Sequence, residues 1–222
     1  MEGRREAAYT ASMKSYFVTA TGTDTGKTFC TAGLLRANPG LRAIKPLLSG
    51  YEPGAASDSS LLLEAMGREV TAQNIATITP WRFRAPLSPD MAAAREGQNI
   101  PYDDLLAFCR AELAKGPTLI EGAGGAAVPL TGTKMTANWI AGLDLPVLLV
   151  SGTYLGSISH CITTAEFLLR RGILIHAILL NESANAPVPT EETQAALARY
   201  LPCTIFPVKR DAKVEDFKAL EL

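Results

Sequence analysis

Short apolar segments alternate with helical patterns along the chain, and this alternation constrains the fold more than any other feature. Six segments have the length and composition of buried strands, and they lie at 15–20, 42–48, 118–123, 146–151, 176–181 and 203–208. Helices are expected at about 27–37, 57–66, 102–115, 135–142, 157–171, 190–200 and 212–219. Such alternation is typical of a mostly parallel sheet with helices on both faces. The sequence therefore predicts a three-layer α/β fold whose ligands bind beyond the carboxyl ends of the strands.

The length of the chain favours a single folding unit. With 222 residues, 47% of them hydrophobic, the chain can bury one sizeable core. It shows no internal repeat and no linker long enough to divide it. We expect residues 1–13 to form a peripheral extension and residues 14–222 to form one domain. The segment 79–94 contains three prolines and is expected to be a long excursion that packs over or near the ligand site.

The charge balance limits the choice of partners. Twenty-one basic residues face 22 acidic ones, without a long block of either sign, which argues against nucleic acid or an anionic membrane as the main partner. The apolar runs are far shorter than the roughly 20 residues of a membrane-spanning helix, so we expect a soluble protein. Four cysteines are scattered without a CxxC pair. They are interpreted as small buried residues in a reducing cytoplasm.

The stretch TATGTDTGKTFCTAGLL, residues 19–35, links the first predicted strand to the first predicted helix. Gly26-Lys27-Thr28 opens that helix, which is the context of a phosphate-binding loop. Backbone N–H groups at a helix N-terminus point at an anion. Lys27 would then reach the β- and γ-phosphates, and Thr28 would ligate Mg²⁺. The GxxxxGK[ST] template places glycine at position 21, where this chain has threonine, so an ordinary strand-to-helix turn stays an alternative at this point.

Three further polar groups follow strand ends or open a helix. Lys45 and Ser49 belong to KPLLSG, Asp58 opens a predicted helix, and Glu121 begins EGAGG. Each has a plain explanation alone: a solvated lysine, a helix N-cap, or a glycine turn. Because the carboxyl ends of parallel strands meet at one edge of a sheet, we expect these groups to converge near Lys27. Carboxylates and a threonine suit Mg²⁺, and lysines suit phosphoryl charge.

These motifs, in this order, resemble those of the dethiobiotin synthetase family over nearly all of residues 14–210. The resemblance is carried by ATGTDTGKT (20–28), KPLLSG (45–50), SD (57–58), APLSPDMAA (85–93), EGAGG with a following PL (121–130), LGSISH (155–160) and Asn181. It implies a P-loop NTPase-like domain and a lengthened phosphate loop. In that loop Ala20 takes the place of the first glycine.

The resemblance also implies a reaction. The family closes a ureido ring on 7,8-diaminopelargonate with CO₂ and ATP, in the biosynthesis of biotin. One amine takes up CO₂ to give a carbamate, whose oxygen attacks the γ-phosphate to form a mixed anhydride. The second amine then closes the ring and expels phosphate. Such chemistry needs placement and charge neutralisation more than acid–base groups, which fits a chain with two histidines. A cytoplasmic, Mg²⁺-dependent ligase is therefore expected.

Roles pass from the family to matching positions. The catalytic residues implied are Lys27, Lys45, Thr23 and Ser49. The nucleotide-binding residues implied are Thr23, Asp24, Thr25, Gly26, Lys27, Thr28 and Phe29, with Asn181 reading adenine and Pro207 in the loop over the base. The metal ligands implied are Thr28, Asp58 and Glu121. The diamine substrate is expected to contact Thr23, Lys45, Ser49, Gly124, Gly125, Leu155, Gly156 and Ser157.

The acid tail of the substrate is where this chain departs from the family. In the family the tail meets the helix after the LG motif and groups of a second subunit, so the resemblance implies a homodimer. The residue before LG, often basic in relatives, is Tyr154 here, and Ser159 replaces an amide side chain found in some relatives. No match for the partner tyrosine is evident. A changed substrate tail and a rearranged contact both stay open, and His160 is either an assisting or a structural residue.

Rival functions are less consistent with the motifs. Partitioning or septum-positioning ATPases share this fold, but they carry a signature lysine five positions before the loop lysine, where this chain has Gly22. Their membrane-binding members need a basic amphipathic tail, whereas VEDFKALEL is mixed to acidic. The amidating branch of the superfamily adds a glutaminase domain, for which we expect no room. A nucleotide-binding module without catalysis would leave the two lysines without a purpose.

Overall fold

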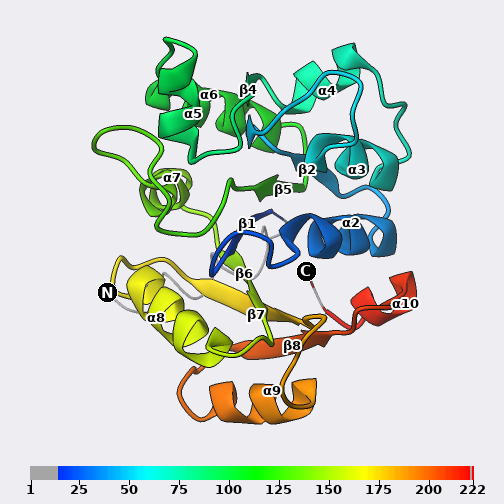
Figure 1. The fold of residues 1–222 in the computed structure, drawn as a ribbon. Coiled ribbons are helices and arrows are strands. Elements are labelled where there is room, and N and C mark those ends of the chain that lie inside the picture. Colours follow the sequence, from blue (N-terminus) through cyan, green and yellow to red (C-terminus); the bar gives the residue numbers. More distant parts are fainter. Residues whose placement is uncertain (1–14, 221) are drawn as a thin grey trace, which may run out of the picture.

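The computed structural model describes residues 15–220 and Leu222, and its centre is a parallel sheet (Figure 1). The strands follow the spatial order β2-β5-β1-β6-β7-β8. Their bounds are β1 Tyr16–Ala20, β2 Arg42–Ile44, β5 Thr118–Glu121, β6 Val147–Gly152, β7 Ile175–Asn181 and β8 Thr204–Val208. Every pairing is parallel; Phe17, for example, lies between Ile120 and Val147. The carboxyl ends of all six strands therefore lie at one edge.

Helices cover both faces of this sheet, as the alternating pattern predicts. On one face α2 packs against α3, α10 and strands β1 and β5, while α6 packs with α7, and α8 with α9, over the other. Their bounds are α2 Lys27–Ala37, α3 Asp58–Ala65, α6 Tyr102–Leu113, α7 Thr136–Leu143, α8 Ser157–Leu169, α9 Thr190–Ala198 and α10 Val214–Phe217. The predicted three-layer α/β architecture is confirmed.

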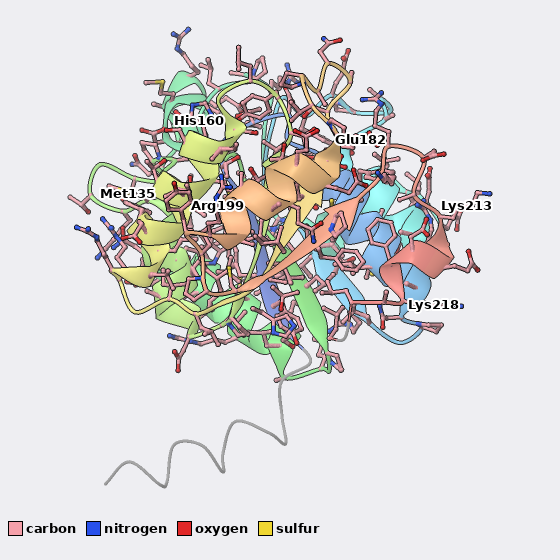
Figure 2. All side chains as sticks on the ribbon, turned by 90° about the horizontal axis from the view of Figure 1, so that it is seen from below. Met135, His160, Glu182, Arg199, Lys213 and Lys218 are labelled. Carbon is pink, nitrogen blue, oxygen red and sulfur yellow. The ribbon has the colours of Figure 1, made fainter. Side chains whose placement is uncertain are left out.

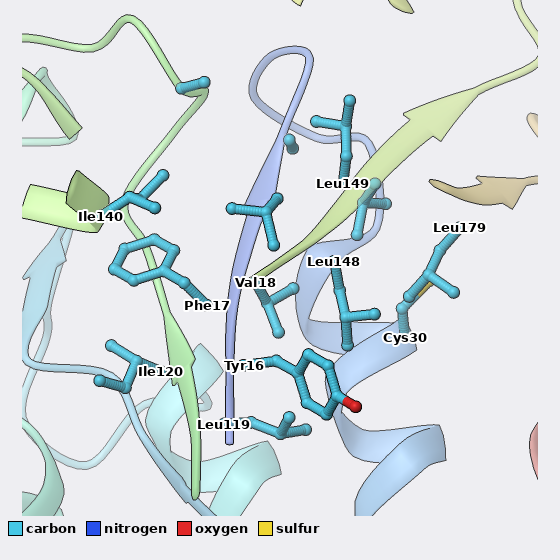
Figure 3. Packing of buried hydrophobic residues seen from close by; sticks show 14 of the residues in the cluster. Tyr16, Phe17, Val18, Cys30, Leu119, Ile120, Ile140, Leu148, Leu149 and Leu179 are labelled. Atoms are coloured by element: carbon cyan, nitrogen blue, oxygen red, sulfur yellow. The ribbon is translucent and has the colours of Figure 1, made fainter. Parts of the chain in front are cut away.

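The apolar strands are buried on both faces, as a sheet covered on both sides requires. The ring of Phe17 meets Trp139 of α7 edge-on, with 4.8 Å between ring centroids. Figure 3 shows Phe17 turned toward Ile140, whereas Cys30 of α2 lies near Leu148 on the opposite face. Because β1 is the inner strand that leads into the phosphate loop, packing on its two sides holds the start of that loop in place.

The predicted strand 42–48 is wrong as a single element. It divides into β2 and a separate strand, β3 Leu47–Ser49, which pairs in parallel with β4 Trp81–Phe83 in a second sheet. Pro46 explains the break, because it has no N–H to donate to a ladder. The N–H of Lys45 bonds instead to the carbonyl of Ile78, 3.1 Å away. The chain thus turns out of the main sheet directly after Lys45.

Two helices were not predicted from the sequence. One ends directly before the excursion at 79–94, and the other begins within it. They are α4 Ala72–Ile78 and α5 Pro89–Arg95. Figure 1 shows β4, α4 and α5 together at one end of the molecule, beyond β2. A hydrogen bond of 3.1 Å from the N–H of Gly50 to the carbonyl of Ala85 ties the excursion back to the end of β3. This contact brings the excursion close to the edge where Lys45 lies.

The remaining sequence expectations have mixed outcomes. Residues 1–13, expected to be peripheral, lie outside the described residues, so that expectation stays a prediction. No helix among the described residues is long and apolar enough to cross a membrane. Three cysteines are buried as predicted, and Cys203 is half-buried. Burial raises the pKa of the Cys109 thiol to about 12, which keeps that thiol neutral.

Candidate active site

The segment between β1 and α2 has the backbone of an anion-binding loop. Gly26 adopts a left-handed conformation with φ of +88° and is the N-cap of α2. A glycine accepts this conformation without strain. No side chain caps the helix, so its first N–H groups stay available to a ligand. Asp24 also has a positive φ, of 57°, which marks the crest of the loop as a constrained turn.

A cavity of about 640 Å³ lies directly over this loop. Residues from five separate parts of the chain line it, as expected for the carboxyl edge of a parallel sheet. Ten of the sequence-predicted site residues are among them: Thr23, Asp24, Gly26, Lys27, Thr28, Phe29, Lys45, Ser49, Asp58 and Gly124. The structure therefore brings the phosphate-loop residues and the residues at the end of β3 to one site.

An ion cluster joins Lys45 to the two predicted metal-binding carboxylates. The Nζ atom of Lys45 lies 2.8 Å from Oε1 of Glu121 and 3.0 Å from Oδ2 of Asp58. The hydroxyl of Thr28 donates to the same Glu121 oxygen at 2.8 Å. Lys45 also donates to the carbonyl of Gly122 at 3.2 Å. Lys45 is only 2% exposed and Glu121 is fully buried, so their charges compensate each other away from water.

The two lysines differ in electrostatic environment. Burial, together with the nearby charge of Lys45, lowers the pKa of Lys27 from 10.5 to about 8. Burial alone would lower the pKa of Lys45 too, but Glu121 and then Asp58 outweigh it and raise that pKa. Burial would likewise raise the pKa of Asp58, whereas its ion pair with Lys45 lowers it. The charged form of Lys45 is therefore stabilised by its two carboxylate partners. The charged form of Lys27 is destabilised in the protein without ligand, and a bound anion would stabilise it.

The plain explanation of Lys45 as a solvated lysine is wrong. Lys27 is 8% exposed and Lys45 is 2% exposed, although both line the cavity. The reason is that α2, β5 and the start of α3 converge around their side chains. The N-cap alternative for Asp58 is also wrong, because Ser57 caps α3 and accepts the N–H of Ser60 at 3.2 Å. The carboxylate of Asp58 is left to contact Lys45.

Two buried oxygens in this region have no hydrogen-bond partner among the described residues. They are Oε2 of Glu121 and Oγ of Ser49. Leaving a buried polar atom unpaired costs about 1–3 kcal/mol, so such atoms commonly meet a ligand. Glu121, Asp58 and Thr28 offer the hard oxygen donors that Mg²⁺ prefers. No cluster of three His, Cys, Asp or Glu exists within the described ranges, so a metal here would depend on ligand oxygens as well. The residues present therefore fit Mg²⁺ bound together with phosphates.

Other predicted site residues lie away from this cavity. Thr25 is buried behind the loop, and Gly125 lines a second cavity of about 420 Å³ with Thr21, Val128 and Phe167. A Cβ on Gly125 would lie 3.1 Å from the carbonyl oxygen of Ala20. Gly124 and Gly125 thus line different cavities, although Thr23 and Val128 line both, and the expected contact of the two glycines with the substrate stays a prediction. The absence of a side chain at Gly125 serves packing against the phosphate loop.

The predicted tail-binding residues lie at the start of α8. Gly156 is the N-cap there, Leu155 is 87% exposed, and Ser157 is buried. Tyr154 and His160 hydrogen-bond to each other, with 2.8 Å between Oη and Nδ1. Figure 2 shows His160 and Glu182, which directly follows β7, along the same edge of the molecule. These residues share an edge with the cavity but do not line it.

The nucleotide-base residues form a separate group at the ends of β7 and β8. Pro207 pairs in register with Leu180, one residue before Asn181. Asn181 donates from Nδ2 to the carbonyl of Thr25 at 3.0 Å. Neither residue lines the cavity of the lysines. Asn181 thus contacts the back of the phosphate loop.

Sequence reasoning missed several apolar residues that shape the cavity. They are Leu47, Leu48, Pro86, Leu87, Pro89, Ala123 and Val128, together with the polar Ser88. The excursion at 79–94 was expected to lie near the site, which agrees with the position of residues 86–89. The three prolines of this segment indicated an excursion near the site, but they did not indicate which of its side chains line the cavity.

A family profile and two sequence relatives each match most of the chain. A sequence profile described as an AAA domain matches residues 14–212. The ATP-dependent dethiobiotin synthetase of Acidiphilium cryptum is 50% identical over 205 residues, which cover 88% of this chain and 92% of the relative. The synthetase of Methylobacterium nodulans is 43% identical, over 89% of this chain and 94% of the relative.

The chain belongs to the dethiobiotin synthetase family. Its members are ATP-dependent ligases, and the chain is one by this relationship. The predicted family and enzyme class are confirmed.

Solved structures show a wider likeness in fold. A ParA family ATPase from Chlorobium tepidum has a TM-score of 0.53 at 14% identity, over 93% of this chain and 90% of the other. A chain of the MinC:MinD cell division protein complex of Aquifex aeolicus has a TM-score of 0.51 at 14% identity, over 92% of this chain and 84% of the other. At such identity the likeness concerns the fold alone. This dethiobiotin synthetase family member therefore shares the architecture of those ATPases, and the rival switch function gains no support beyond it.

Proposed function

We propose that residues 14–222 form one Mg²⁺-dependent dethiobiotin synthetase domain, which makes a cyclic urea from 7,8-diaminopelargonate, CO₂ and ATP. One observation carries this proposal: a phosphate loop and a buried lysine, Lys45, that is paired with two carboxylates face a single cavity. A simple nucleotide switch needs the loop, but it has no use for a second buried cation. A carbamate nucleophile needs such a cation, because the carbamate is an anion that must approach the negatively charged γ-phosphate.

The phosphate end of the site would be held by the loop and the start of α2. The N–H groups around Gly26 and Lys27 would bind phosphate oxygens, supported by the helix dipole. Pairing with the negative β- and γ-phosphates would raise the lowered pKa of Lys27 again. Phe29, 39% exposed on the first turn of α2, and Asp24 would border the nucleotide.

The metal end of the site would be held by Thr28, Asp58 and Glu121. Bound Mg²⁺ would neutralise phosphate charge during transfer. Glu121 would contribute Oε2, its oxygen without a partner among the described residues. Its other oxygen accepts from Thr28 and Lys45, which fixes the carboxylate in one orientation.

The diamine end of the site would be formed by Thr23, Lys45, Ser49 and Gly124. Lys45 would pair with the carbamate and bring its oxygen toward the γ-phosphate. The buried hydroxyl of Ser49 would donate to the carbamate or to the phosphate. The carbamate oxygen forms a bond to phosphorus as the bond from phosphorus to ADP breaks. The second amine then attacks the carbon, loses a proton, and expels phosphate together with that oxygen.

The direct test of this function is an incubation with Mg²⁺, ATP, bicarbonate and diaminopelargonate. Mass spectrometry should find the cyclic urea, and a coupled assay should find ADP in equal amount. Omission of any one component should remove the urea. ATP hydrolysis that is indifferent to the diamine would instead favour a switch ATPase.

A Glu121→Gln variant is expected to need more Mg²⁺. The amide keeps the shape of the side chain but loses the charge that would hold the metal. The Mg²⁺ concentration that gives half-maximal activity in the ring-closure assay should rise at least about tenfold. The matched control is Glu112→Gln, which alters a carboxylate that pairs with Arg42 and Lys115 far from the cavity. An unchanged metal titration in Glu121→Gln would remove this residue from the ligand set.

We further propose that the enzyme works as a homodimer in the cytoplasm, where ATP is available and the four thiols stay reduced. An apolar surface supports the dimer: the second cavity is lined by Ala126, Ala127, Val128 and Phe167, and Leu155 and Ile158 are exposed on the start of α8. Light scattering should give about twice the chain mass of 23.6 kDa. A mass equal to one chain at micromolar concentration would contradict the dimer.

A further inference from the structure

The contact between Asn181 and the phosphate loop joins two parts of the molecule that sequence reasoning kept apart. Asn181 ends β7, and its Nδ2 donates to the carbonyl of Thr25 at 3.0 Å. The identity of the donor is unambiguous, because a carbonyl accepts and only the amide nitrogen donates. The side chain also packs closely on Gly26, since a Cβ built there would lie 2.1 Å from Nδ2.

The geometry of the peptide bond gives this contact a consequence. In a trans peptide the C=O and the following N–H point in opposite directions. Asn181 lies outside the cavity of the lysines, whereas Gly26 lines it. Holding the carbonyl of Thr25 toward Asn181 therefore turns the N–H of Gly26 away from β7, toward the cavity. That N–H is one of the donors a phosphate loop offers to its anion.

The loop has few other restraints near its crest. Thr23 and Asp24 form a tight turn, but within the described part of the chain no backbone hydrogen bond ties residues 22–25 to another element. The hydroxyl of Thr25 reaches the carbonyl of Gly22 only at a long 3.4 Å. The positive φ of Asp24 also leaves this turn dependent on outside support. Asn181 supplies that support at the peptide directly before the helix.

We propose that Asn181 is a positioning residue for the phosphate loop, which aims the N–H of Gly26 at the phosphates of the nucleotide. This role rests on the proposed function and differs from reading adenine, the role implied by the family resemblance. A base reader affects ligands that carry a base. A loop-positioning residue affects every ligand with a phosphate chain.

Inorganic tripolyphosphate separates the two roles, because it has three phosphates and no base. Binding of Mg²⁺-tripolyphosphate and of Mg²⁺-ATP would be measured by calorimetry for the wild type and for Asn181→Leu. Leucine has nearly the shape of asparagine, is neutral, and cannot donate. The matched control is Ser183→Ala, which removes a strand-end hydroxyl that accepts the N–H of Thr153 and does not touch the loop.

We expect Asn181→Leu to bind tripolyphosphate at least about tenfold more weakly than the wild type, and Ser183→Ala to bind it normally. A second variant, Asn181→Ala, should show the same loss, so the result does not depend on how leucine packs. In protein labelled with ¹⁵N-glycine, tripolyphosphate should shift the Gly26 amide signal in the wild type and not in Asn181→Leu. That signal would be assigned by its disappearance in Gly26→Ser.

Other outcomes have distinct meanings. Normal tripolyphosphate binding by a folded Asn181→Leu that has lost ATP affinity would overturn the inference and leave Asn181 as a base reader. If the wild type binds tripolyphosphate and ATP but the Gly26 signal does not move, the peptide argument is wrong. Failure of the wild type to bind either ligand would overturn the proposed function itself.

Discussion

A Lys45→Met variant is expected to lose ring closure and about 3–5 kcal/mol of folding free energy, because it removes one partner of a buried ion pair. Methionine has a similar length, so the change removes the charge and little volume. Glu121 is fully buried and would lose the cation that lies 2.8 Å from its Oε1. Turnover should fall roughly 10²–10³-fold, as for the loss of one group that stabilises transition-state charge.

The stability loss of Lys45→Met should depend on pH with a definite sign. The pair with Lys45 lowers the pKa of Asp58 in the folded protein. That pairing stabilises the fold above the unfolded pKa of Asp58, and the effect disappears as the pH falls through the folded pKa. The variant lacks it, so the difference in unfolding free energy between wild type and variant should be largest near neutral pH and shrink in acid.

A double variant separates stability from catalysis. Lys45→Met combined with Glu121→Gln removes both the cation and the buried charge, so it should regain much of the lost stability. Ring closure should stay as slow as in Lys45→Met, since the carbamate still has no cation. The measurements are denaturant unfolding and the ring-closure assay. If Lys45→Met unfolds at the wild-type denaturant concentration, the ion cluster does not stabilise the fold as described.

The neighbouring lysine should give the opposite result for stability. A Lys27→Met variant is expected to lose turnover roughly 10²–10³-fold and to unfold at a higher temperature than the wild type. Lys27 is buried and, within the described residues, forms no ion pair of its own, and its pKa falls from 10.5 to about 8. Its charge therefore opposes folding in the protein without ligand.

The sign of the pH effect follows from linkage. Because the unfolded chain holds the Lys27 proton up to a higher pH, wild-type stability decreases as the pH falls from about 10.5 toward 8, and the cost is fully present below 8. The gain in Lys27→Met should therefore be largest below pH 8 and vanish in alkali. Thermal unfolding at a series of pH values checks this. A lower melting temperature for Lys27→Met at pH 7 would mean that Lys27 supports the fold.

Much of the fold follows from local sequence. Five of the six strands of the main sheet appear within two residues of the predicted bounds, since each is a short apolar run between helical patterns. The exception at 42–48 shows what periodicity misses. Lys45 and Pro46 interrupt an otherwise apolar run, and the hydrogen bond from Lys45 to Ile78 that ends β2 comes from a helix far along the chain. Short helices such as α4, with seven residues, carry too little pattern to be recognised.

The site was predictable where spacing fixes it. The loop at 23–29 and the residues at the ends of β3 and β5 meet because the topology brings them together. Burial was not predictable, because it depends on how α2, α3 and β5 close around Lys45. The separation of Gly124 and Gly125 into different cavities depends on the turn at φ +65° of Gly124, which the sequence EGAGG does not specify. The contact of Asn181 with Thr25 joins residues 156 positions apart and has no local signature.

If the site activates a carbamate by phosphorylating it, one oxygen atom of CO₂ must end in the released phosphate. The protein, diaminopelargonate, Mg²⁺ and ATP would be mixed with freshly dissolved ¹⁸O-labelled CO₂. The reaction would be stopped before the oxygen atoms of CO₂ exchange with those of water. Phosphate would then be examined by mass spectrometry. We expect labelled phosphate, with the oxygen derived from CO₂, in step with the cyclic urea. Unlabelled phosphate formed alongside the urea would contradict the account, because the carbamate oxygen would then never have been joined to phosphorus.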